Sequence, residues 1–472
     1  MQNTQLQEVL QKFMKKDLKT FSDYLRSPYF TKKITLLSFW EEIKEFAPDF
    51  EISELQKQQI CEKISGKIFS DSYYRNLCSD MLEIVINYLA EEEFHNAPHD
   101  IAQFRNEALL KAGLFNLLEK NIKQTDLLID KSQLPHPKKL YQKIRIDDYT
   151  INLHIRRNRN KHENITKLML DVDRPKKIMD YALGKSLLHI LNHIRASKIV
   201  KEKFDYSFVE HYLYIYEKGL TSNDSFVNAY YLATKIAITG NEEFYFKLKE
   251  ILFEDDQSLP ANDSANLFVV LIDFVFPRGE TGERKWLNEM FEIYDFRLNK
   301  NFWKLHADFA YTSLLNIIQT SLILGKIQYA EEVIEKYGPL ISASVRSHII
   351  NLCNAWISFY KGEAEAAHQY LIPIESENIV IKYSLRTLQA MIYFEKGEFQ
   401  VLHSYIDSFK HFINYNSETI EGVIKTSGLT FCNLMNLMIK LKLDPDQKNA
   451  DKLRKEILES EFLMKEWFLK QV

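Results

Sequence analysis

Apolar and small residues recur in the second half of the chain with the spacing of a single helix face. Three glycines, Gly325, Gly362 and Gly397, stand 37 and 35 residues apart, and the positions five, eight, nine and twelve places after each carry the same kind of residue. Those positions hold Ala330, Val333, Ile334 and Tyr337 after the first glycine, Ala367, Tyr370, Leu371 and Ile374 after the second, and Leu402, Tyr405, Ile406 and Phe409 after the third. Because i, i+3, i+4 and i+7 spacing lays one stripe along a helix, its recurrence predicts stacked helix pairs.

Residues 1–97 differ from these repeats and predict a helical N-terminal subdomain. Short helical patterns are broken at Ser27-Pro28 and Pro48-Asp49, and a long apolar-periodic stretch then starts at Asp71 and is closed by Pro98. We expect Asp71 to be the N-cap of this helix, because a carboxylate at that position accepts backbone N–H groups of the first turn.

Residues 98–173 and 174–472 form two further predicted segments. The first contains a helix pair around Gly113 and then a long, charged, basic helix. The second contains divergent helical repeats, with an imperfect copy around Gly240, and ends in a capping helix, because the terminal unit of an array needs one polar face. The stripe of that capping helix holds Leu453, Ile457, Met464 and Phe468.

The composition favours helices over strands. The 472 residues include 13 glycines and 11 prolines, each under 3% of the chain, where average usage is about 7% and 5%. Both residues are unfavourable inside helices, and alternating β-branched runs are nearly absent. We therefore predict an all-α, right-handed superhelical array of helix pairs behind the N-terminal subdomain.

The net charge, the longest apolar run and the cysteine positions limit the possible partners and the cellular location of the protein. A net charge of −4 gives no global attraction to nucleic acid or to anionic lipid. The most apolar run, Leu267 to Phe276, is half the ~20 residues that a membrane span needs, so no membrane anchoring is expected. The four cysteines lie in no paired spacing, which indicates neither a disulfide framework nor a zinc site and favours a cytoplasmic location.

The turn at each glycine resembles that of the tetratricopeptide repeat, whose two helices meet at a glycine followed five positions later by alanine. Gly325 with Ala330 and Gly362 with Ala367 match this pattern, whereas Leu402 stands at the alanine position after Gly397. The family has a second small position, seven residues before the glycine. Ala355 and Ala390 fill it before Gly362 and Gly397, whereas Ile318 stands there before Gly325. The resemblance implies tetratricopeptide-like helix pairs.

The whole chain is also similar to a family of uncharacterised bacterial helical-repeat proteins that open with a Ser-Pro-Tyr-Phe segment. The matching residues are Phe21, Leu25, Ser27-Pro28-Tyr29-Phe30, Pro48-Asp49-Phe50, Arg75, Leu77 and the turn from Leu324-Gly325 to Ala330-Glu331. Thr31, where the family has Asn, and Gly184, inside an expected helix, depart from it. This resemblance implies a fold and no activity.

No catalytic, cofactor, metal or nucleotide motif is present in the sequence, so we expect a non-catalytic protein. The pairs His95/His99 and His189/His193 have the i, i+4 spacing of zinc-binding helices but lack the glutamate of the metalloprotease pattern, and we interpret them as ordinary histidines. The segment from Arg278 to Glu283 has two glycines but no Lys-Ser/Thr ending, and it predicts a turn rather than a phosphate loop.

The predicted function is that of a scaffold whose concave groove binds a protein or peptide partner. The first helices of the pairs should bury Ile318, Leu322, Ala355, Phe359, Ala390 and Phe394. The groove residues should lie between those positions, at Asn316, Gln319, Asn354, Ser358, Gln389 and Tyr393.

An alternative is a nucleic-acid-associated regulator. The densest basic run, residues 154–162, contains Arg156, Arg157, Arg159 and Lys161, which would contact phosphates with a strong dependence on salt. Acidic residues flank the run on both sides, so ion pairs along a solvated helix are the competing interpretation.

Overall fold

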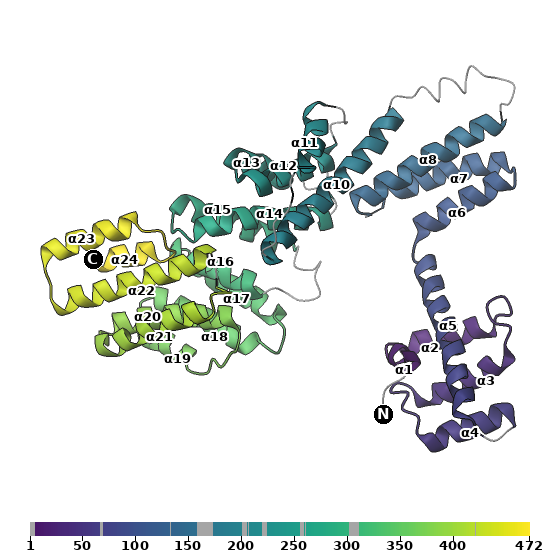
Figure 1. The fold of residues 1–472 in the computed structure, drawn as a ribbon, viewed down its shortest axis with the longest axis horizontal. Helices are drawn as coiled ribbons and strands as arrows, with labels where there is room; N and C mark the ends of the chain where they lie inside the picture. The colour runs from purple at the N-terminus through teal and green to yellow at the C-terminus, as the bar shows by residue number, and fades with distance from the viewer. Residues whose placement is uncertain are drawn as a thin grey trace. The chain divides into compact units, whose positions relative to one another are not determined.

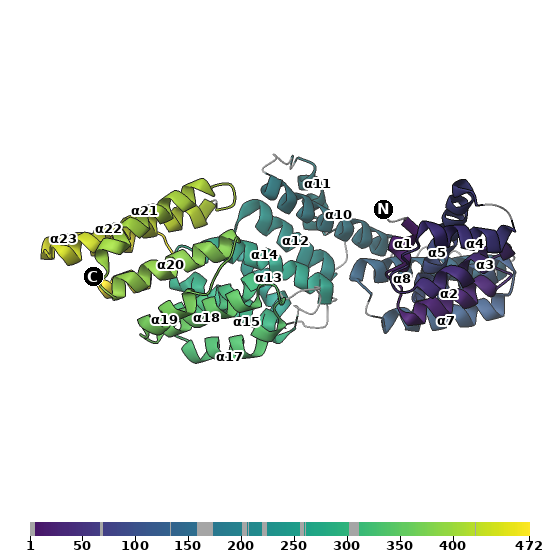
Figure 2. The same cartoon turned by 90° about the horizontal axis from the view of Figure 1, so that it is seen from below.

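The computed structural model is all-helical over the residues that it describes, with no strand among them, which confirms the predicted all-α class. Those residues are 5–66, 69–132, 134–157, 173–200, 205, 207–219, 224–254, 259, 261–301, 311–420 and 422–472. The chain divides into two compact units, the first made of residues 1–132 and 145–170 and the second of residues 133–144 and 171–472. Figures 1 and 2 draw the helices of both units.

In the first unit, the long helix α5 packs against the four helices that precede it. The helices are α1 (Gln5–Leu10), α2 (Lys15–Arg26), α3 (Ile34–Ile43), the 3-10 turn η1 (Lys44–Phe46), α4 (Glu54–Ser65), α5 (Asp71–His95), α6 (Pro98–Lys111), α7 (Phe115–Asp130) and, from residue 145 onward, α8 (His136–Arg157). Phe21, Phe39, Trp40 and Met81 are fully buried at the centre of its largest core. Burial of such large side chains from α2, α3 and α5 holds this part together.

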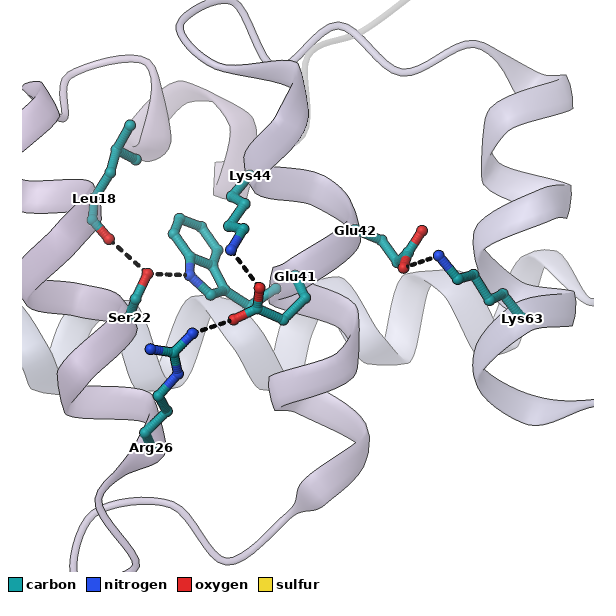
Figure 3. Close-up of polar contacts among 8 residues, drawn as sticks. Leu18, Ser22, Arg26, Glu41, Glu42, Lys44 and Lys63 are labelled. Carbon is teal, nitrogen blue, oxygen red and sulfur yellow. Dashed lines mark hydrogen bonds and ion pairs between the residues drawn. The ribbon is translucent and has the colours of Figure 1, made fainter.

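A polar contact orients the buried Trp40 ring. Its Nε1–H donates to Ser22 Oγ at 2.7 Å, and the Ser22 hydroxyl donates to the Leu18 carbonyl at 2.7 Å (Figure 3). The ion pairs drawn beside it join Glu41 to Arg26 at 3.0 Å and to Lys44, and Glu42 to Lys63. The indole thus keeps its hydrogen bond inside the core, as a buried donor must.

Helix α5 begins at Asp71, and the N-cap position belongs to Ser70. The prediction of Asp71 as the N-cap was therefore wrong by one residue. The Asp71 carboxylate instead forms an ion pair with Arg75, one turn further along the same helix. A carboxylate in the first turn still interacts favourably with the helix dipole, so the sequence signal was right about the location of the helix start.

The second unit is built from successive helices. They are the beginning of α8, α10 (Asp173–Val200), α11 (Val209–Glu217), α12 (Ser225–Thr239), α13 (Glu242–Glu254), α14 (Ala261–Gly279), α15 (Arg284–Asn299), α16 (Tyr311–Ile323), α17 (Ile327–Tyr337), the 3-10 turn η3 (Gly338–Leu340), α18 (Arg346–Tyr360), α19 (Ala364–Leu371), α20 (Ile379–Glu395), α21 (Phe399–Tyr415), α22 (Gly422–Leu443), α23 (Gln447–Glu459) and α24 (Lys465–Gln471). Helix α10 packs against α11 and α12, and from α12 onward each α-helix packs against the next. Helix α16 also packs against α18, and α18 against α20. One continuous hydrophobic core runs through the unit.

The turns at Gly325, Gly362 and Gly397 have the same geometry. Each glycine has a φ between +70° and +83°. Its N–H donates to the carbonyl three residues earlier, and the next N–H donates to the carbonyl five residues earlier, as in Lys326 N–H to the Ser321 carbonyl at 2.8 Å. This is the Schellman ending of a helix, in which the left-handed conformation favours glycine.

The predicted apolar stripes are buried or half-buried with one exception. Ile318, Leu322, Ala355, Phe359, Ala390 and Phe394 on the first helices are each at most 8% exposed. On the second helices, Ala330, Ala367 and Leu402 are fully buried, whereas Tyr370 is 39% exposed. The exception lies on α19, the shortest helix of the three pairs, where the stripe position faces solvent.

Gly184, inside α10, allows this helix to lie close to α12. A Cβ added at Gly184 would lie 2.8 Å from the ring of Phe226, which is itself held between His136 and Tyr230. The glycine that departs from the expected helical pattern therefore serves close packing of two helices.

The C-terminal segment forms two helices, α23 and α24, rather than the single predicted capping helix. Helix α23 ends at Ser460, whose backbone is extended. The break redirects the chain so that Phe462 and Phe468 are both fully buried. The four predicted stripe residues are buried, but they come from two helices and the connection between them.

Candidate functional site

In the second unit, a cavity of about 120 Å³ lies among alternate helices. Its wall is formed by the end of α14, by α16, α18, α20 and α22, and by residues 462–464. Most of the lining is apolar, including Phe276, Leu315, Trp356, Ile420, Phe431 and Phe462. A concave, largely apolar space with a few polar groups is the usual form of a small-ligand site.

The connection between α23 and α24 closes this cavity by pairing with the turn between α14 and α15. The Phe462 N–H donates to the Thr281 carbonyl at 3.1 Å, and the Leu463 N–H donates to Ser427 Oγ at 3.3 Å. Gly282 permits the approach, because its φ is +78° and an added Cβ would lie 2.4 Å from the Phe462 carbonyl oxygen. The conformation of this turn thus requires glycine.

Helix α24 is held in place at three points. The Trp467 Nε1–H donates to Glu395 Oε1 at 3.1 Å, and Glu466 forms an ion pair with Arg284 at 2.9 Å. The Phe468 ring lies against that of Phe431 with centroids 5.3 Å apart. The C-terminal helix is therefore fixed to the unit, and it anchors residues 462–464, which line the cavity.

The Ser384 hydroxyl, on α20, accepts hydrogen bonds from side chains of two neighbouring helices. Gln319 Nε2 donates to Ser384 Oγ at 2.6 Å, and Trp356 Nε1 donates to the same oxygen at 3.0 Å. Asn316 Nδ2 donates to the Tyr294 hydroxyl at 2.8 Å. These contacts use donors within the wall and leave amide oxygens of Asn316 and Gln319 without a bond from any described residue.

Glu280, which follows the last residue of α14, lines the cavity and is 7% exposed. No described residue donates a hydrogen bond to its carboxylate or forms an ion pair with it. Burial raises the pKa of the Glu280 carboxyl to about 7. Removing a carboxylate from water without a partner disfavours the charged form, so the group is half protonated near neutral pH.

An open groove of about 400 Å³ adjoins the cavity and shares Phe276 and Asn316 with it. It is lined by α14, α15 and α16, with apolar contributions from Val269 and Ile272. The Arg297 guanidinium also lines it, and Arg297 Nε is buried without a hydrogen-bond partner among the described residues. The Asp273 carboxylate lines the groove as well and forms an ion pair with Arg195 at 3.0 Å. The groove therefore combines an apolar wall with a cation whose Nε is unpaired.

Two of the six predicted groove residues lie at these sites. Asn316 and Gln319 are half-buried and line the cavity. The structure does not bring the other four to it.

The other four lie between helices or elsewhere on the unit. Ser358 and Gln389 are 8% and 7% exposed. Gln389 Nε2 lies 3.2 Å from the ring nitrogen Nδ1 of His368, and Tyr393 packs against the same histidine. Asn354 is half-buried on α18.

The described part of the basic run lies in the first unit. Arg157 forms an ion pair with Glu119 at 2.6 Å and donates to Asn116 Oδ1 at 2.7 Å. Arg156 donates to the Leu110 carbonyl at 3.2 Å. These bonds hold α8 beside α6 and α7. Arg159 and Lys161 lie outside the described residues.

The histidine pairs do not converge with other metal-binding side chains. His95 is exposed, with Nδ1 2.7 Å from the Glu91 carbonyl, and His189 and His193 are exposed on α10. Within the described ranges, no group of three or more His, Cys, Asp or Glu side chains is arranged to hold a metal ion.

Glu280 is the site residue that the sequence did not reveal. It stands in the segment from Arg278 to Glu283, which was predicted as a turn and does connect α14 to α15. A glutamate in a turn is usually exposed. The signal that was available is the pair Gly279 and Gly282 around it, because glycines in a turn permit close approach of another segment.

No helix in the described part of the chain is both long and apolar enough to cross a membrane. Comparison of the chain with protein-family models, with curated proteins and with solved structures gives no match. The assignment of a function therefore depends on the geometry of this chain alone.

Proposed function

We propose that the chain is a non-catalytic scaffold of tetratricopeptide-like helix pairs that binds a protein or peptide partner. The identical glycine turns support the helix-pair repeat, as do the fully buried alanines at the two small positions, Ala330 and Ala367 on second helices and Ala355 and Ala390 on first helices. Small residues there let paired helices approach closely, and stacked pairs create an extended binding face.

The groove between α14 and α16 is the proposed binding face, and Arg297 is the observation that carries it. A buried guanidinium nitrogen without a partner is unfavourable, and a carboxylate from a ligand would satisfy it. Val269, Ile272 and Phe276 beside it offer an apolar surface. The partner that fits is a segment with an apolar side chain next to an acidic group.

Affinity purification of the tagged chain from its native cells, with and without nuclease, tests this proposal. Arg297→Gln and Asn316→Ala should each lower recovery of a stoichiometric partner about tenfold, because a hydrogen bond to a charged group contributes about 1.5–3 kcal/mol. Gln369→Ala, on the exposed side of α19, is the matched control and should leave recovery unchanged.

The melting temperature of each variant should stay close to that of the wild type, so that a change in partner recovery reports binding and not unfolding. A partner recovered equally by all variants would contradict the proposed groove. Partners that vanish with nuclease would contradict protein binding and favour the alternative of phosphate contacts through Arg156 and Arg157.

A further inference from the structure

The polar lining of the cavity includes acceptors that no described donor uses. Gln319 and Trp356 donate to Ser384, and the Tyr383 hydroxyl donates to the Ile424 carbonyl at 3.4 Å. The Thr387 hydroxyl likewise donates to a backbone carbonyl of its own helix. The Glu280 carboxylate and the amide oxygens of Asn316 and Gln319 therefore remain to accept hydrogen bonds from a ligand.

The Glu280 carboxylate is the strongest of these acceptors, and no positively charged side chain of the cavity lining balances its charge. The described residues that line the cavity include no lysine, arginine or histidine. Tyr294 from α15 and Tyr383 from α20 are the titratable groups near Glu280, and burial raises the pKa of both phenols, that of Tyr294 to about 12. Both are neutral at physiological pH, so neither compensates a charge on Glu280.

Aromatic side chains make up much of the remaining wall. Phe276, Trp356, Phe431 and Phe462 all line the cavity. Aromatic faces attract cations within about 6 Å of the ring, and an aromatic wall beside a carboxylate is the usual recognition device for organic ammonium groups.

The size and access of the cavity limit the ligand. Its volume of about 120 Å³ is slightly below the roughly 150 Å³ cavity that accommodates benzene. Val380, which is 47% exposed, and the exposed Thr419 are among the lining residues, so the cavity reaches the surface beside the start of α20. A compact ligand of about five or six heavy atoms can therefore enter and fit.

We propose that this cavity binds an alkylammonium group, with the charged nitrogen against the Glu280 carboxylate and the short alkyl body against Phe276, Trp356 and Phe431. The group can come from a free small amine or from a lysine side chain of a partner, since the chemistry is the same. The cavity and the proposed peptide groove share Phe276 and Asn316, but Arg297, Val269 and Ile272 of the groove lie outside this cavity's lining. The inference therefore does not depend on the groove's cation.

Calorimetric titration of the full chain with n-butylammonium at pH 8 tests the proposal. Saturable one-to-one binding is expected, weakened at least tenfold in Glu280→Gln and at least tenfold for 1-butanol, which keeps the alkyl body without the charge. Glu283→Gln, an exposed glutamate of the same turn, is the matched control and should bind as the wild type does. Because the pKa of Glu280 is about 7, affinity should fall about tenfold from pH 8 to pH 6.

The absence of saturable binding at pH 8 would overturn the proposal, and so would equal binding of 1-butanol or equal loss in Glu283→Gln. Nα-acetyl-lysine amide serves as the second probe. Binding as tight as that of n-butylammonium would support a partner's lysine as the source, whereas weaker binding would support a free amine. Arg297→Gln should leave the affinity for n-butylammonium unchanged. The proposed peptide groove and the proposed ammonium site can therefore be refuted independently of each other.

Discussion

At the scale of single residues, the buried Glu280 carboxyl links stability to pH. Its pKa rises from 4.5 to about 7 on burial, so the folded state holds the proton more tightly than the unfolded state. The stabilising contribution of the protonated group is fully present below about pH 4.5 and is lost as pH rises through 7. The loss therefore accumulates between about pH 4.5 and 7, and in neutral solution most of it has already taken place.

Glu280→Gln removes this dependence. At pH 8, the free energy of unfolding of the variant should be up to about 3 kcal/mol higher than that of the wild type, whereas at pH 4.5 the two should be nearly equal. Urea denaturation at both pH values measures the difference. Glu283→Gln, which is exposed, should not change the difference between the two pH values. A uniform shift at both pH values would show that Glu280 acts through packing rather than ionisation.

At the scale of elements, α24 belongs to the core of the second unit. Phe468 is fully buried and contacts the rings of Phe431, Phe462 and Trp467. The helix has only seven residues, too few to be stable by itself, so its conformation depends on these contacts.

Phe468→Ala should lower the free energy of unfolding by about 3–5 kcal/mol, because it leaves a cavity among aromatic rings. Chemical denaturation followed by circular dichroism measures the change. Leu458→Ala on α23 is the matched control, since Leu458 is 56% exposed and its truncation should cost under about 0.5 kcal/mol. Similar small losses in both variants would mean that α24 detaches readily.

At the scale of the whole molecule, the two units have separate hydrophobic cores. Phe39 lies in the main core of the first unit and Phe409 in the core of the second, and both are fully buried. No described residue belongs to both clusters. Local stability in each unit should therefore depend on its own core.

Phe39→Ala should speed amide hydrogen exchange in α3 and α5 and leave α20 and α21 unchanged, and Phe409→Ala should do the reverse. Exchange followed by mass spectrometry measures both effects, and each variant is the control for the other. Faster exchange in both units from a single substitution would show that they unfold as one cooperative body.

Rules that relate only neighbouring residues were sufficient to predict part of this structure. The glycine positions and the stripes after them predicted the helix pairs from Gly325 onward, because a Schellman turn and a one-sided apolar helix are encoded within about a dozen neighbouring residues. The same rules predicted the turn around Glu280 but not its burial. They also missed the break at Ser460.

The sequence by itself determined the all-helical class, the turns at Gly325, Gly362 and Gly397 and most of the buried positions on the helices beside them. Only the tertiary structure decided that residues 462–464 line the same cavity as Phe276 and Leu315, which are more than a hundred residues earlier in the chain, and that Glu280 lies inside it without a partner. The physical reason is that burial and charge pairing depend on contacts between distant segments. Such contacts leave no periodic signal in the sequence, whereas helix and turn formation depend on neighbours along the chain.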